Sequence, residues 1–172
     1  GKYAFRNCGL TKVYFNAGTC EIYGEPEIAH GYISPFVDNP NLTEFEFGKN
    51  VATIPGEVCA KLTSLNNVTF KGSVTEIGRY AFYNCTSLSK IDISNVQVIN
   101  ESAFENCNSL VGIDGNESAG VIAFSDKLRK IKDYAFSGCS KITQVTIPES
   151  ATYIGKYAFR NCGLTKVYFN AG

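Results

Sequence analysis

Seven cysteines are the residues of this 172-residue chain best suited to redox or metal chemistry. Five of them recur at one position of a repeated segment, next to an Ala-Phe pair: Cys8, Cys85, Cys107, Cys139 and Cys162. A free cysteine behaves as a small buried hydrophobic residue, whereas a disulfide between adjacent turns requires Cα atoms within about 7 Å. The spacing therefore predicts a row of buried thiols, with Cys20, in an insertion, as the accessible one.

The other reactive residues do not form a recognisable catalytic or metal site. His30 is the only histidine and no Cys-x-x-Cys pair occurs, so neither a nucleophile activated by histidine nor a zinc site is expected. The segment from Asp114 to Ser118 has the oxygen ligands that open a calcium loop, but Ala119 and Ser125 stand where that loop needs glycine and glutamate. We expect a protein that is not an enzyme and that binds no metal or cofactor.

Five Asn-x-Ser/Thr sequons are present, and they begin at Asn41, Asn67, Asn84, Asn100 and Asn116. They fit glycosylation of a secreted eukaryotic protein. Chance explains them equally well, because the repeated segment is itself rich in Asn, Ser and Thr.

The charge balance argues against polyanionic and membrane partners for the chain as a whole. Sixteen basic residues offset sixteen acidic ones, so no net charge attracts nucleic acid or an anionic membrane. No apolar run approaches the roughly 18 residues of a spanning helix, and the N-terminus has no signal-peptide pattern. Because the first residues already lie inside a repeat, we expect a fragment or a mature form.

The elements that position these residues repeat along the chain. Four segments, which start at Ile77, Ile99, Ile131 and Ile154, read Ile-x-x-x-Ala-Phe-x-x-Cys without gaps. In two degenerate repeats, Phe36 and Cys59 take the Phe position and Asn39 and Leu62 take the Cys position. The residues at the Phe position are Phe5, Phe36, Cys59, Phe82, Phe104, Phe136 and Phe159. Successive ones lie 22 or 23 residues apart, except for two steps of 31 and 32 residues that contain insertions near 16–27 and 114–120.

Each repeat has two halves. Leu88-x-x-Ile91-x-Ile93 shows the period of two of a half-buried strand, and the equivalent inward pairs are Val13/Phe15, Phe45/Phe47, Val68/Phe70, Val145/Ile147 and Val167/Phe169. The Ala-Phe-x-x-Cys spacing predicts one short helical or 3₁₀ turn. One strand and one turn cannot bury their apolar face alone, so the units must stack.

The string Ile-Gly-x-x-Ala-Phe-x-x-Cys-x-x-Leu-x-x-Ile resembles the BspA-like, or Treponema-type, class of leucine-rich repeats over the whole chain apart from the insertions. The resemblance implies one β-rich, curved solenoid over residues 1–172, with one strand and one short helical turn in each repeat and a repeat period of 22–23. It also implies a secreted or cell-surface module that binds a protein, such as a host or matrix protein, or a glycan, for adhesion. The alternative is a structural spacer or a self-associating array with no dedicated ligand.

The binding surface predicted for such a stack is its concave sheet. Residues that flank the inward pairs point outward, and stacking aligns them in columns: Lys12, Tyr14, Glu44, Glu46, Asn67, Thr69, Lys90, Asp92, Gln144, Thr146, Lys166 and Tyr168. The insertion near 114–120 leaves the strand between Asp92 and Gln144 ambiguous.

Residues 1–18 are identical to residues 155–172. An internal duplication within a longer array, deliberate design, and a repeat unit chosen for a periodic stack all explain this identity. In each case the chain begins and ends in mid-pattern without a capping repeat, so we expect end-to-end association that continues the solenoid.

Overall fold

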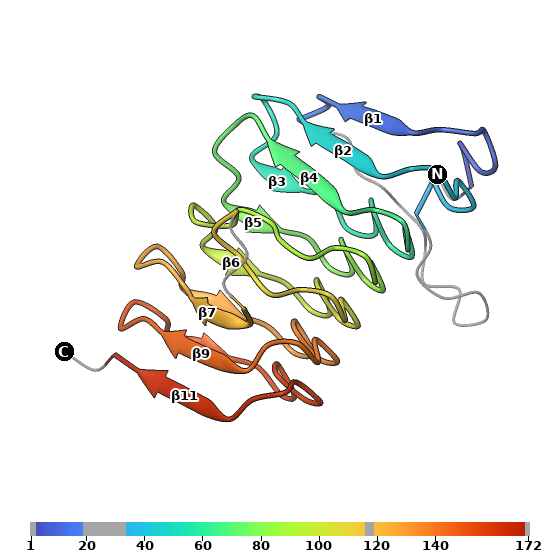
Figure 1. The fold of residues 1–172 in the computed structure, drawn as a ribbon. Helices are drawn as coiled ribbons and strands as arrows, with labels where there is room; N and C mark the ends of the chain where they lie inside the picture. Colours follow the sequence, from blue (N-terminus) through green and yellow to red (C-terminus); the bar gives the residue numbers. More distant parts are fainter. Residues whose placement is uncertain (1–2, 19–33, 116–118, 171–172) are drawn as a thin grey trace.

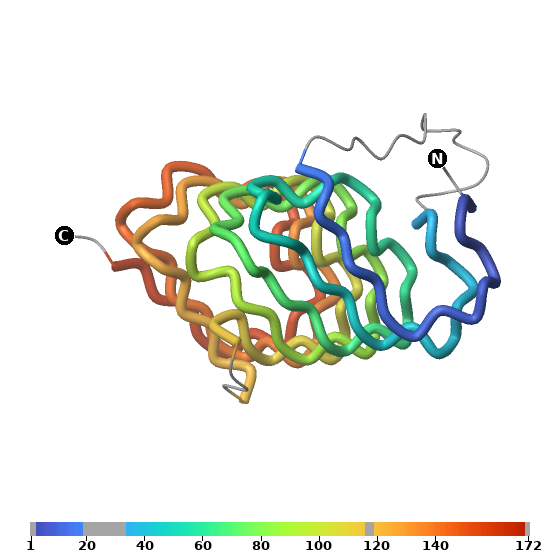
Figure 2. Tube along the Cα trace, turned by 90° about the horizontal axis from the view of Figure 1, so that it is seen from above, coloured from blue at the N-terminus to red at the C-terminus, as the bar shows by residue number. Residues whose placement is uncertain are grey.

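The computed structural model describes residues 3–18, 34–115 and 119–170, and shows a stack of coils that advances along one axis (Figures 1 and 2). The strands are β1 (Lys12–Phe15), β2 (Glu44–Phe47), β3 (Thr53–Ile54), β4 (Asn67–Phe70), β5 (Glu76–Ile77), β6 (Val98–Ile99), β7 (Val121–Ala123), β8 (Lys130–Ile131), β9 (Gln144–Ile147), β10 (Tyr153–Ile154) and β11 (Lys166–Phe169). Most of the insertion near 16–27, together with Cys20, His30 and Asn116, lies outside the described residues.

Two sides of each coil are built from parallel strands. The longer strands form two sheets, in the orders β1-β2-β4 and β11-β9-β7. Segments 90–92 and 112–114 lie between these two sheets in the stack and are joined to each other by two isolated bridges. We call the outward surface of these strands the long-strand face. The shorter strands form one sheet in the order β10-β8-β6-β5-β3, and its outward surface is the short-strand face.

The third side, around the Phe position, is not the helical or 3₁₀ turn that the spacing predicted. The described residues contain no helix. Tyr80 and Asn84, on either side of Phe82, have φ of 56° and 57°, which a right-handed helix excludes. The Phe82 N–H donates to the carbonyl oxygen of Ala103 in the next repeat at 2.8 Å, while the Cys85 N–H donates within its own turn to Phe82. Hydrogen bonding between repeats therefore replaces the helix.

The predicted register of the Phe positions is confirmed by stacked rings along the core. Phe82 and Phe104 have centroids 5.3 Å apart with 5° between their planes, and Phe104 and Phe136 are 5.2 Å apart at 12°. Phe136 continues the row to Phe159 at 5.4 Å, and Phe5 stacks on Phe36 at 5.1 Å. The side chains of Phe82, Phe104 and Phe136 are fully buried.

The predicted thiol row is confirmed in the middle of the stack. Cys85, Cys107 and Cys139 are buried free thiols, and each donates to the carbonyl oxygen at the preceding Phe position at 3.1 Å. In the degenerate repeat, the Asn39 amide makes the same contact, to the Phe5 carbonyl oxygen at 2.8 Å. Where this position holds Cys or Asn in these repeats, the side chain donates to the preceding coil, whereas in the Cys59 repeat Leu62 fills it with a buried apolar side chain.

Two expectations of burial are wrong at the edges of the described stack. Cys8 is exposed and not buried, because its coil has a neighbouring coil on one side alone within the described residues. The inward pair Val167/Phe169 is also exposed, at 49% and 68%, because β11 is an edge strand of its sheet.

Candidate functional site

The predicted outward residues do line up in columns on the long-strand face. Lys12, Glu44 and Asn67 occupy one register position of β1, β2 and β4, and Tyr14, Glu46 and Thr69 occupy the next outward position. At the other end of the face, Gln144 aligns with Lys166 and Thr146 with Tyr168. In the middle, Lys90 faces Gly112 and Asp92 faces Asp114. The columns are therefore real, although the hydrogen-bonded sheet beneath them is interrupted.

The column residues at β1 and β2 form a charged and aromatic cluster. The Lys12 ammonium lies 3.1 Å from the Glu44 carboxylate and 4.7 Å from the centroid of the Tyr14 ring. Hydrogen bonding to Glu44, and secondarily to Tyr14, raises the pKa of Lys12. Tyr14 is 71% exposed. The cluster presents an oriented aromatic ring beside a lysine that stays charged.

An open hollow of about 400 Å³ continues this cluster toward the ends of β1, β2 and β4. It brings the predicted residues Tyr14 and Glu46 together with Asn16, Lys49 and Lys71. The Lys71 ammonium lies 3.9 Å from the Glu46 carboxylate. Sequence reasoning missed Asn16, Lys49 and Lys71 because they follow the strands and have no place in the period-two pattern.

One repeat contributes two segments to the long-strand face, the bridged segment 112–114 and the strand β7. Between Phe104 and Phe136, segment 112–114 bridges to segment 90–92, and β7 then pairs with β9. On the short-strand face the same stretch supplies β8 alone, between β6 and β10. The insertion near 114–120 therefore adds an extra strand to one side of the stack, which resolves the ambiguity of the sequence at this point.

Hydrogen bonds join the two segments of this repeat where they begin, and join the end of β7 to the preceding repeat. Where they begin, the Gly120 N–H donates to the Val111 carbonyl oxygen at 3.2 Å. Gly120 has φ of +82°, and a Cβ there would collide with the Lys141 carbonyl oxygen, so other residues do not fit. Beyond β7, the Ser125 hydroxyl donates to the Ser94 carbonyl oxygen of the preceding repeat at 2.7 Å.

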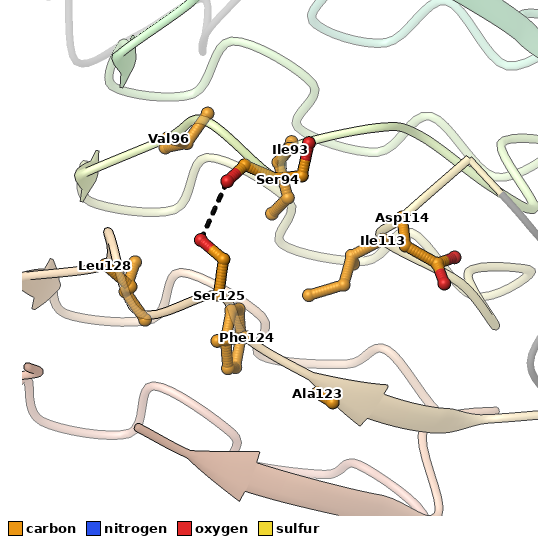
Figure 3. Close-up of a pocket in the computed structure, with 9 residues that line it drawn as sticks. All are labelled: Ile93, Ser94, Val96, Ile113, Asp114, Ala123, Phe124, Ser125 and Leu128. Atoms are coloured by element: carbon orange, nitrogen blue, oxygen red, sulfur yellow. Dashed lines mark hydrogen bonds between the residues drawn. The ribbon is translucent and has the colours of Figure 1, made fainter. Parts of the chain in front are cut away.

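A cavity of about 150 Å³ lies between segment 93–96 of the preceding repeat and segment 123–128, beside Ile113 and Asp114 (Figure 3). Buried apolar side chains form its floor: Ile93, Val96, Ile113, Phe124 and Leu128. Its rim contains the exposed residues Ser94, Asp114 and Ala123 and the half-buried Ser125. An apolar cavity of this volume holds a group of about the size of benzene. The cavity can therefore take one aliphatic or aromatic side chain.

The remaining predicted features do not add a second site among the described residues. Residues 3–18, 34–115 and 119–170 contain no group of three or more His, Cys, Asp or Glu side chains that could hold a metal ion. In the same ranges, no helix is long and apolar enough to cross a membrane. The sequon residue Asn100 uses its side-chain amide to donate to Glu76 and to the Ile77 carbonyl oxygen.

Comparisons with known proteins place the repeat in a family. The model described as BspA type leucine rich repeat region matches residues 34–122 and 115–172, in six copies. A leucine-rich repeat protein from Bacteroides ovatus is 26% identical with a TM-score of 0.69, and covers 96% of this chain. A leucine rich cell surface protein from Faecalibacterium prausnitzii is 30% identical with a TM-score of 0.55, and covers 76% of this chain. The chain spans 39% of the length of each of these two structures. No curated protein matches.

Proposed function

The chain belongs to the BspA-type leucine-rich repeat family, and we propose that it is a non-catalytic module that binds a protein partner on the long-strand face. The observation that carries this proposal is the apolar cavity between β7 and the preceding repeat. It lies on the same face as the predicted columns, and its rim residue Ala123 aligns with Thr146.

The proposed binding mode combines one apolar anchor with polar contacts around it. An aliphatic or aromatic side chain of the partner enters the cavity, where Phe124 and Ile113 exclude water from it. The column residues then provide the polar rim that interfaces usually have around a buried anchor. The predicted ligand-binding residues from Lys12 to Tyr168 belong to this rim.

A secreted or surface-attached location fits this proposal. One of the similar structures is described as a cell surface protein. An extracellular partner, such as a host or matrix protein, is therefore the class that we propose, and adhesion is the activity that its capture would support.

Filling the cavity tests the proposal. We expect Ala123→Trp to abolish capture of peptides selected from a random displayed library, because the indole blocks the rim while Ala123 is already exposed. Peptides selected on the unsubstituted protein should share one aliphatic or aromatic residue. The control is Val121→Trp, which adds the same side chain to the same strand at a position that is 41% exposed and does not line the cavity.

Capture is measured by biolayer interferometry on immobilised protein, with melting curves to confirm that both variants fold. Retention of binding by Ala123→Trp, or equal loss in both variants, would show that the cavity is not the anchor.

A specific observation also favours the alternative, a self-associating array. The β1 segment is held on β2 by the Lys12–Glu44 pair at 3.1 Å and by the Phe5–Phe36 stack. Residues 155–172 carry the same sequence, so this segment of a second copy can make the same contacts when it displaces β1 from β2. We expect the 172-residue chain to associate with rising concentration in sedimentation velocity, and Glu44→Lys to weaken the association. A monomer at every concentration would contradict this alternative.

A further inference from the structure

The short-strand face carries a concentration of positive charge on one coil. Segment 127–132 supplies four cations, Lys127, Arg129, Lys130 and Lys132, around the inward residues Leu128 and Ile131. Lys127, Arg129 and Lys130 are exposed, and Lys132 is half-buried. We call these four residues the basic coil.

The fold does not require these charges, as the aligned positions of the other coils show. The register aligns Lys130 with Val98 and Tyr153, and through β5 with Glu76 and Thr53. At the positions equivalent to those of the basic coil, the other four coils together carry one charged residue, Glu76. The equivalent residues, coil by coil, are Asn50, Ala52, Thr53 and Pro55; Ser73, Thr75, Glu76 and Gly78; Asn95, Gln97, Val98 and Asn100; and Ser150, Thr152, Tyr153 and Gly155.

The basic coil also differs from other parts of the molecule in how its charges are balanced. Several cations elsewhere pair with a carboxylate on the adjacent coil, as Lys12 does with Glu44 and Arg79 does with Glu101 at 3.0 Å. Around the basic coil, Lys127 donates to the Asn95 amide oxygen at 2.5 Å, and Arg129 donates to the Asp126 carbonyl oxygen at 2.8 Å. Both acceptors are neutral groups.

The carboxylates near the basic coil lie at its two ends. Asp126 precedes it in the chain, Glu149 lies in the adjacent turn, and Asp133 follows it. Four like charges held close together repel one another. An anionic ligand would relieve that repulsion.

An aromatic ring and a hydrogen-bond acceptor lie beside the basic coil. Tyr153 is 46% exposed and occupies the register position next to Lys130. Its hydroxyl donates to the Asp133 carboxylate at 3.3 Å, which also accepts the Lys156 N–H at 3.0 Å. Asp133 raises the pKa of Tyr153, so the phenol stays a neutral donor and its ring is held in place.

We propose that the basic coil, with Tyr153 and Asp133, binds an anionic polysaccharide. Lys127, Arg129, Lys130 and Lys132 bind its carboxylate or sulfate groups by charge-assisted hydrogen bonds. The Tyr153 ring packs against the apolar face of a sugar. Asp133 accepts hydrogen bonds from sugar hydroxyl groups.

The acidic residue favours a glycan over a nucleic acid. A phosphate backbone offers acceptors and negative charge along its length, and Asp133 would repel it. A polysaccharide carries hydroxyl donors between its anionic groups, so it can use both the cations and the carboxylate. Lys130 and Tyr153 belong to the short-strand face, whereas the cavity opens beside Ala123 on the long-strand face. Segment 127–132 contributes one inward side chain, Leu128, to that cavity, so the two proposals involve different exposed side chains and either can fail without the other.

Binding of heparin (sulfated), hyaluronate (carboxylated), neutral dextran and single-stranded DNA to the full chain, measured by isothermal titration calorimetry, tests the proposal. We expect at least one of the two anionic polysaccharides to bind with an affinity that falls as salt rises, and dextran not to bind. Lys130→Ala/Lys132→Ala is expected to weaken this binding about tenfold or more. Tyr153→Ala should weaken it severalfold, while Tyr153→Phe, which keeps the ring, should retain most of it.

The matched control is Lys141→Ala/Arg160→Ala, which removes the same charge from two exposed cations outside the basic coil. It should leave affinity within about twofold, and all variants should keep the melting temperature of the parent. Equal loss in both double variants, tighter binding of DNA than of either polysaccharide, or no binding of either polysaccharide would overturn the proposal. Loss of polysaccharide binding in Ala123→Trp would also place the site elsewhere.

Discussion

Replacing Phe104 with Ala is expected to lower the free energy of unfolding by about 3 to 5 kcal/mol. The side chain is fully buried, and its ring stacks between Phe82 at 5.3 Å and Phe136 at 5.2 Å. Truncation therefore leaves a cavity between two coils and removes two aromatic pairs at once. The rings on either side belong to different repeats, so the stack cannot close the cavity by moving a single loop.

The loss should extend beyond the substituted coil, because each coil of a solenoid is stabilised by its neighbours. Urea unfolding gives the free energy, and hydrogen exchange of the Phe82 and Phe136 amides shows whether the adjacent turns open. Phe169→Ala is the matched control: the same truncation at a side chain that is 68% exposed should cost less than about 1 kcal/mol. A cost below about 0.5 kcal/mol for Phe104→Ala would contradict the register of the repeats.

The period of the sequence was sufficient to predict the core. Positions that recur once in every repeat share one interior, so the Phe row and the central thiols followed from spacing alone. The degenerate repeat is instructive: Asn39 shares neither shape nor polarity with cysteine, yet its amide donates to the Phe5 carbonyl oxygen as the thiols do to theirs. Asn39 and the central cysteines thus share a hydrogen bond to that carbonyl, whereas Leu62 in the Cys59 repeat shows that the position also accepts a buried apolar side chain.

The turn at the Phe position was not predictable from local spacing. Residues such as Tyr134 and Tyr157 have φ of 59° and 57°, a conformation that costs energy for non-glycine residues. Hydrogen bonds to the next coil, such as that of the Tyr134 N–H to the Lys156 carbonyl oxygen at 2.9 Å, offset this cost. Those bonds join residues from different repeats, so no local pattern in the sequence reveals them.

The candidate site was predicted in part. The columns follow from the alternation in each strand, which is why Lys12 and Glu44 were named and do lie side by side. The cavity depends on the extra strand β7, which follows the insertion. There the Gly120 N–H donates to the Val111 carbonyl oxygen of the same repeat, a hydrogen bond that the other repeats do not predict. An insertion has no repeated counterpart to align with, so its structure could not be inferred from the rest of the chain.

A second large effect is expected from the buried thiols: the free energy of unfolding should fall at alkaline pH. Burial raises the pKa of Cys107 to about 12, and raises the pKa values of Cys59, Cys85 and Cys139 well above 9.0. In the unfolded chain a thiol ionises near its ordinary pKa of about 8.5. Above that pH the folded state binds more protons than the unfolded state, so the free energy of unfolding falls as pH rises. Below about pH 8 the thiols contribute no pH dependence.

Each buried thiol should contribute a fall of about 1.4 kcal/mol per pH unit between its unfolded and folded pKa values. We expect Cys107→Ala to be less stable than the parent at pH 7, because it loses the hydrogen bond to the Phe82 carbonyl oxygen. The deficit should shrink by about 1.4 kcal/mol per pH unit from pH 9 to pH 11, since the variant has one thiol fewer to ionise on unfolding.

Urea unfolding at several pH values, followed by circular dichroism with a reductant present, measures both slopes. Cys8→Ala is the control, because Cys8 is exposed and its replacement should leave the slope unchanged. Other groups that titrate in this range, such as the lysines and tyrosines, are the same in all three proteins and cancel in the comparison. If the free energies of unfolding of Cys107→Ala and the parent fall in parallel from pH 9 to pH 11, the Cys107 thiol is accessible to solvent in the folded state. That outcome would contradict its burial in the stack.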